Sequence, residues 1–144
     1  MTPLQTVFFA LLVAINGAGG VVHIEQSAEE LHMEYQGAPL HAAAWTICEP
    51  GSCTVTVGPE TDLELVYRYL RSEDVREFRM GERVRAAISA RLLVHELAHA
   101  YDAFHEPFID GSPGHHGAWV PEGHCRTSAA ERYACSVALT GSIR

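Results

Sequence analysis

The stretch LLVHELAHAYDAFHE, residues 92–106, carries two histidines four positions apart with a glutamate between them. In a helix, His95 and His99 lie within about 40° of each other and roughly 6 Å apart along the axis, so both imidazoles can reach one zinc ion. Glu96 is turned by about 100° from His95, so it can reach a water molecule at that metal without joining the ligands. The arrangement predicts two metal ligands and a general base for hydrolysis.

The same pattern can arise by chance, so the flanking residues matter. The apolar residues ARLLV before the motif and LA inside it would bury this helix against a sheet. Burying two histidines and a glutamate there without partners would cost on the order of several kcal/mol. A bound metal ion removes that cost, and the sequence therefore favours zinc (Zn²⁺) over a helix with no metal.

The letters HELAHAYD, residues 95–102, resemble the active-site helix of zincin metallopeptidases and are especially similar to that of the mitochondrial Atp23-type peptidases. The resemblance is strong over residues 92–106, loose over residues 90–141 and absent from residues 1–80. It implies a zinc-dependent peptidase of gluzincin type acting on a peptide or protein substrate. Water then attacks the peptide bond, with Glu96 as the general base.

The resemblance leaves two main candidates for the third zinc ligand. His105 stands where metzincins place a third histidine, in the longer motif H-E-x-x-H-x-x-G-x-x-H. Two departures count against His105. Asp102 replaces the glycine at which the metzincin chain turns, and the sequence has no methionine after Met80 to form the Met-turn.

Glu131 is the candidate that we favour. The letters AERYACSVA, residues 130–138, resemble the second metal-binding helix of gluzincins, in which a glutamate faces the zinc and a small residue follows three positions later. Here that small residue is Ala134. In the alternative interpretation, Ser128 and Glu131 form a capping box, and Glu131 only stabilises the start of its helix.

Further polar residues could support the metal site. Asp102, one turn after His99, is expected to accept a hydrogen bond from a ligand imidazole or a nearby backbone group and so to fix the ring. The segment of residues 106–126 contains two weaker ligand candidates, Asp110 and His124. Other side chains there could line the cleft or stabilise an oxyanion, namely His115, His116, His124 and Trp119.

Hydrophobic periodicity predicts the helices that position these residues. Residues 82–105 form a long helix that begins after a break at Gly81, and residues 127–141 form a second helix. The glycine- and proline-rich residues 106–126 form the loop between them.

The N-terminal half is predicted to supply the sheet. Strands are expected where β-branched and aromatic residues or alternation occur, at residues 21–26, 31–37, 42–48 and 53–58. Residues 61–72 are interpreted as a helix with Thr61 as its N-cap. Together these elements predict an α+β fold with antiparallel or mixed strands at its start. The resemblance implies that residues 21–144 form a small zincin-like domain.

Four cysteines bear on the compartment. Cys48 and Cys53 flank the turn residues EPGS, so a disulfide could join the two strands of that hairpin. Cys125 and Cys135 form the remaining pair. An even number of cysteines next to an export signal favours disulfides, although four cysteines permit three pairings and a cytosolic chain would keep all four reduced.

The first twenty residues predict a signal peptide or a membrane anchor. The apolar run of residues 7–15 has the length of a signal-peptide core, and residues 4–22 could serve as an uncleaved anchor. In the alternative interpretation, this run is the buried first element of a cytosolic domain. We therefore expect a secreted or membrane-anchored protein, with a cytoplasmic location as the alternative.

Charge and composition narrow the classes of function. The formal net charge is −8 and all ten basic residues are arginine, without a basic cluster, so nucleic acid is excluded as an expected partner. Six of the nine histidines fall between His95 and His124. Besides the peptidase, two alternatives stay open, namely a non-enzymatic binding module stabilised by zinc and an exported peptidase that acts as an effector or toxin.

Overall fold

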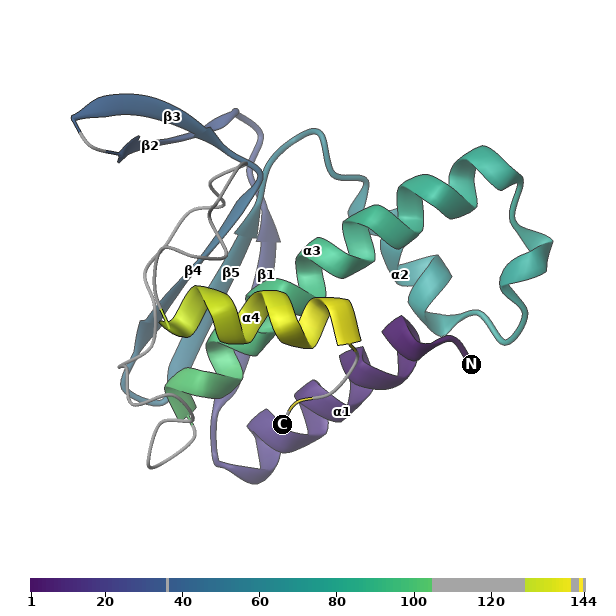
Figure 1. Cartoon of the computed structure of the whole chain (residues 1–144), viewed down its shortest axis with the longest axis horizontal. Helices are drawn as coiled ribbons and strands as arrows, with labels where there is room; N and C mark the ends of the chain where they lie inside the picture. The colour runs from purple at the N-terminus through teal and green to yellow at the C-terminus, as the bar shows by residue number, and fades with distance from the viewer. Residues whose placement is uncertain (36, 105–128, 141–142, 144) are drawn as a thin grey trace.

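The computed structural model describes residues 1–35, 37–104, 129–140 and 143 (Figure 1). Four α-helices, five strands and one 3-10 helix make up this part of the chain, which has a mixed α+β architecture. The elements are α1 Pro3–Gly17, β1 Val21–Gln26, β2 Leu31–Tyr35, β3 Ala38–Ala42, β4 Ala44–Glu49, β5 Ser52–Val57, α2 Leu63–Arg71, η1 Val75–Glu77, α3 Met80–Phe104 and α4 Ala129–Thr140.

The main sheet has three strands in the order β1-β5-β4. β4 and β5 form the predicted antiparallel hairpin, and β1 pairs with β5 in parallel. The prediction of mixed strands is therefore confirmed. Because β4 pairs with β5 alone within the described chain, it forms one edge of this sheet.

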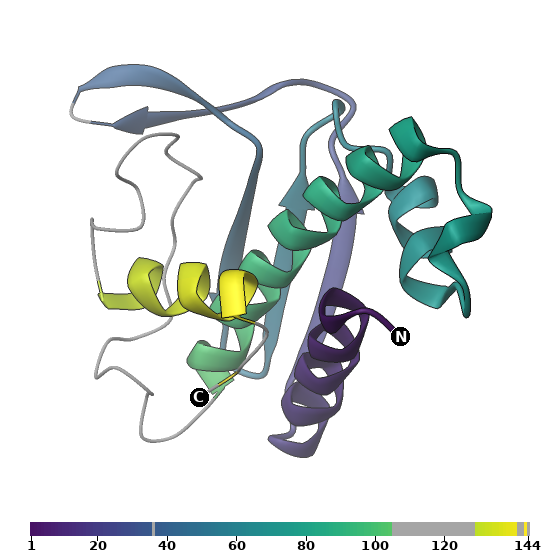
Figure 2. The same cartoon turned by 45° about the vertical axis from the view of Figure 1, so that its right-hand side comes forward.

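A second, two-stranded sheet consists of β2 and β3 and projects from the body of the molecule (Figure 2). Gly37 has a φ of 81° between the two strands, a conformation that favours glycine in a tight turn. The predicted strand of residues 31–37 therefore ends at Tyr35. β3 was not predicted, because it contains Pro39 and few β-branched residues.

The long helix α3 lies against β4 and β5, with α1 beside it and α4 crossing it (Figures 1 and 2). All residues from Leu93 to Asp102 are buried, whereas Val84 and Ile88 near its start are exposed. The helix begins at Met80, so the predicted start at residue 82 and the break at Gly81 are wrong. The N–H groups in the first turn of a helix have no intrahelical partners, and a glycine there lowers the stability of the helix less than a glycine in its interior. Gly81 can therefore lie within the first turn of α3.

Residues 61–72 do contain the predicted helix, α2, but its N-cap differs. The side chain of Asp62 accepts a hydrogen bond from the backbone N–H of Leu65 at 3.1 Å. The prediction of Thr61 as the N-cap is wrong by one residue. Asp62 fits this position because a carboxylate is among the strongest N-cap groups and opposes the positive end of the helix dipole.

The predicted leader forms helix α1. Thr2 and Gln5 make a capping box at its start, and its apolar face, which includes Leu11 and Ile15, is buried in the same core as α3. Within the residues that the structure describes, no helix is both long enough and apolar enough to cross a membrane. Cleavage of this segment and its role in export stay predictions.

The backbone at the end of α1 also touches the end of α3. Gly20 is buried, and a Cβ atom built on it would lie 2.5 Å from the ring of Phe104. No side chain fits in that space, because carbon atoms pack at about 3.5 Å or more. Gly20 therefore lets the last turn of α3 pack directly on the connection between α1 and β1.

The predicted hairpin disulfide is confirmed. Cys48 and Cys53 are directly opposite in the register of β4 and β5, and their sulfur atoms are bonded at 2.03 Å. Cys135 in α4 is also disulfide-bonded. Cys125, the remaining cysteine of the second predicted pair, lies outside the described residues.

The buried amide of Gln5 generates a stability prediction. Its Nε2 donates to the backbone oxygens of Tyr69 and Ser72, at 2.8 Å each, where α2 ends. Replacing Gln5 with leucine keeps the volume but removes both hydrogen bonds, one of them in a fully buried setting. We expect a loss of about 1–3 kcal/mol in the free energy of unfolding, measured by chemical denaturation. The control Asn16→Ala removes an exposed amide from the same helix, and an equal loss in both variants would contradict the prediction.

Candidate metal centre

Three side chains from two helices converge inside the protein. His95 and His99 project from the buried half of α3, and Glu131 comes from the first turn of α4. Their exposed fractions are 1%, 1% and 2%. The two helices cross at this point (Figures 1 and 2), so the site forms only when the chain on either side of residues 105–128 is folded together.

The ligand atoms of the three residues lie about 3 Å apart. The Nε2 atoms of His95 and His99 are separated by 3.2 Å. Each carboxylate oxygen of Glu131 faces one ring, with Oε2 at 3.2 Å from the Nε2 of His95 and Oε1 at 3.0 Å from the Nε2 of His99. Ligand atoms about 2.0–2.1 Å from a tetrahedral metal ion are separated by about 3.3 Å. The two imidazoles and the carboxylate could therefore hold such an ion between them.

Other nearby groups are less suited to the metal. The sulfur of Cys135 lies within 4.8 Å of ligand atoms of His95 and Glu131. Because Cys135 is disulfide-bonded, it cannot supply a thiolate. A carboxylate oxygen of Glu96 also lies within 4.8 Å of ring nitrogens of both histidines, close enough to act on a molecule at the metal.

The side chain of Thr46, on strand β4 of the main sheet, contacts Glu96. The Thr46 hydroxyl lies 3.1 Å from Glu96 Oε2 and 3.2 Å from the Glu96 backbone oxygen. Burial, and next the negative charge of Glu131, raise the pKa of Glu96 to about 8, while the hydrogen bond from Thr46 lowers it. Sequence reasoning missed Thr46. The sequence feature that could have indicated Thr46 is a polar residue at a position of β4 that alternation assigns to the buried face.

Asp102 is fully buried, as expected for a residue one turn beyond His99 on the inner face of α3. Its predicted hydrogen bond to a ligand imidazole stays a prediction. The remaining candidates lie outside the described residues, namely His105, Asp110, His115, His116, Trp119 and His124.

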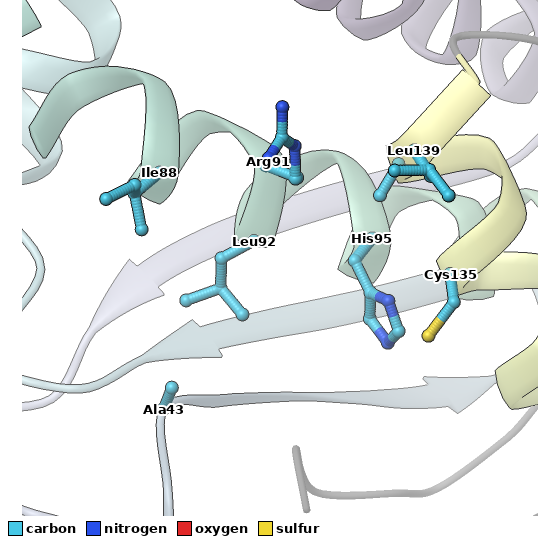
Figure 3. A pocket seen from close by; sticks show the side chains of 8 residues that line it. Ala43, Ile88, Arg91, Leu92, His95, Cys135 and Leu139 are labelled. Atoms are coloured by element: carbon cyan, nitrogen blue, oxygen red, sulfur yellow. The ribbon is translucent and has the colours of Figure 1, made fainter. Parts of the chain in front are cut away.

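An apolar cavity of about 440 Å³ opens beside His95. Figure 3 shows the His95 ring and the Cys135 sulfur close together at one end, with Leu92 and Ile88 following along α3. The lining residues are Ala43, Ile88, Arg91, Leu92, His95, Cys135, Ala138 and Leu139. A volume of this size can take an apolar side chain of a ligand that reaches the metal centre.

Comparison with protein-family models, with curated proteins and with solved structures finds no match to this chain. The likeness to zincins thus depends on the motif residues and on the geometry around them.

The raised pKa of Glu96 predicts how the stability of the metal-free protein varies with pH. Between the ordinary pKa of 4.5 and the folded value of about 8, the folded state binds more protons than the unfolded state. The free energy of unfolding therefore falls as the pH rises through this window. In chelator, Glu96→Gln should raise stability relative to wild type more at pH 8.5 than at pH 5, by on the order of a few kcal/mol.

Chemical denaturation at the two pH values checks this expectation. The control is Glu64→Gln, because Glu64 is an exposed glutamate on α2. A stability difference between Glu96→Gln and wild type that stays constant from pH 5 to pH 8.5 would contradict the prediction.

Proposed function

We propose that this chain is a zinc-dependent peptidase of gluzincin type, with a zincin-like domain built around α3 and α4. His95, His99 and Glu131 would hold the zinc ion. The observation that carries the proposal is the convergence of the H-E-x-x-H helix and a glutamate 32 positions after His99, whose ligand atoms lie 3.0–3.2 Å from one another. All three groups are buried, and burying them together would be costly without a metal ion.

Zinc held by these three residues would supply a Lewis acid that lowers the pKa of water towards neutral pH. Glu96 accepts a proton from the attacking water as the new C–O bond forms at the peptide carbonyl. It then delivers the proton to the leaving amine as the C–N bond breaks. The nearness of Glu96 to both histidines supports this role.

Two features support a peptide substrate. β4 is an edge strand of the described sheet, and a substrate in extended conformation could pair with its backbone. The cavity between α3 and α4 begins at His95 and is lined mainly by apolar side chains such as Leu92 and Leu139. We therefore propose that the substrate places an apolar side chain there, next to the bond that is cleaved.

The disulfides support a compartment outside the reducing cytosol. The Cys48–Cys53 bond and the disulfide-bonded Cys135 are groups that persist in oxidising environments. They agree with a secreted or membrane-anchored peptidase.

A non-enzymatic module is the second candidate, favoured by one observation. The ligands come from both α3 and α4, so the metal would join two helices and stabilise the fold even without catalysis. A structural site needs a fourth protein ligand, whereas a catalytic one leaves that position to water.

The ligand assignment can be tested with single alanine variants. Glu131→Ala should lose tight zinc binding and the stability that zinc provides, because a ligand is removed. His105→Ala and the exposed control Arg132→Ala should both keep about one zinc per chain. Metal analysis and thermal unfolding with and without chelator measure these effects. Full zinc in Glu131→Ala, with zinc lost in His105→Ala, would instead support the metzincin arrangement.

The general base has a separate test. Glu96→Gln keeps a polar side chain of the same size but cannot accept the proton. It should bind about one zinc per chain, remain folded and hydrolyse peptide bonds at least about a hundredfold more slowly than wild type. Cleavage of fluorescently labelled casein by the zinc-loaded proteins measures this loss. Undiminished cleavage by Glu96→Gln would rule out the proposed mechanism.

A further inference from the structure

Thr46 places a hydroxyl group at a fully buried position, where an apolar side chain would be expected. It is fully buried on β4, at a position that points to α3, between Ala44 and Cys48 on the same face of the strand. Valine has the same shape, forms strands well and has no polar group to bury. A buried hydroxyl without hydrogen bonds would cost on the order of 1–3 kcal/mol. Its partners therefore indicate what the hydroxyl does.

Both acceptors near the Thr46 hydroxyl belong to one residue. Its oxygen lies 3.1 Å from Oε2 of Glu96 and 3.2 Å from the backbone oxygen of Glu96. A hydroxyl has one proton to donate, so it serves one of these two acceptors at a time. When it donates to Oε2, it holds that carboxylate oxygen against the sheet, while the other oxygen, Oε1, has no hydrogen bond to any described residue.

The contact also links two parts of the proposed active site. Thr46 lies on β4, one of the two edge strands of the described main sheet, with which an extended peptide could pair. Glu96 lies on α3 beside the ligand His95. The hydrogen bond therefore sets the distance between the strand that would bind substrate and the carboxylate that would accept the proton.

We infer that Thr46 is a positioning residue, which orients the Glu96 carboxylate for proton transfer through the hydrogen bond from its hydroxyl. The inference rests on the proposed peptidase function. It assigns a role to a residue outside the H-E-x-x-H motif, at a separation of 50 positions from Glu96. Small errors in the position of a catalytic group lower the rate of the chemical step more than they lower substrate binding.

The test compares Thr46→Val, Thr46→Ser and the control Thr54→Val, which makes the same change on the neighbouring strand β5. Each protein is loaded with zinc and assayed with a quenched fluorescent peptide that has an apolar residue at its centre. We expect Thr46→Val to keep about one zinc per chain and an unchanged KM but to lose about tenfold in kcat. Thr46→Ser should retain kcat within about threefold, because it keeps the hydroxyl.

A second measurement does not depend on activity. In chelator, the thermal midpoint of unfolding is measured for Thr46→Val in the wild-type and in the Glu96→Ala backgrounds. We expect Thr46→Val to lower the midpoint by several degrees in the first and by less in the second, because Glu96→Ala removes the carboxylate acceptor and leaves only the backbone oxygen of residue 96. An equal shift in both backgrounds would show that the hydroxyl acts on the backbone oxygen and not on the carboxylate, and would overturn the inference.

The outcomes separate the inference from the proposed function. Active wild type with an equally active Thr46→Val overturns the role of Thr46 and leaves the peptidase proposal standing. Zinc-loaded wild type without hydrolysis overturns the peptidase proposal, and the catalytic role of Thr46 with it. A fall in kcat that Thr46→Ser does not recover would indicate a packing effect and would also overturn the inference.

Discussion

Five ionisable side chains are buried on α3 and at the start of α4, and the rest of the structure has to compensate for them. His95, Glu96, His99, Asp102 and Glu131 are each at most 2% exposed. Removing charged groups from water is so costly that they must be paired, protonated or bound to a metal. Three carboxyl groups and two imidazoles leave an excess of negative charge when the carboxyl groups are ionised, and either protonation of Glu96 or the proposed cation would offset it.

The helices and the sheet each contribute different polar groups to the candidate site. α3 supplies four of the five groups and is buried at every position from Leu93 to Asp102, where small residues such as Ala98 let other elements approach closely. α4 brings the fifth group from a distant part of the sequence, and Ala134 keeps the crossing narrow. β4 contributes a hydroxyl instead of a charge. Each of these elements thus provides a different part of the site.

The sequence predicted those features that depend on local spacing. The convergence of His95 and His99 follows from helical geometry, and the hairpin with Cys48 and Cys53 follows from a turn between two strand-like segments. Glu131 was found only through a resemblance, since nothing local indicates which helix will cross α3. Thr46 was missed, because its role depends on a contact between a strand and a helix that periodicity does not encode.

The parallel pairing of β1 with β5 was equally beyond local reasoning, and it determines where the N-terminal segment lies. Gly20 sits between α1 and β1 with the ring of Phe104 packed directly on its backbone. An enzyme that removes a leader at this point needs an extended, accessible peptide bond, and the folded chain covers Gly20. Removal of the leader at Gly20 would therefore have to come before folding. The timing of chain processing would then decide whether α1 is present to cover its side of α3.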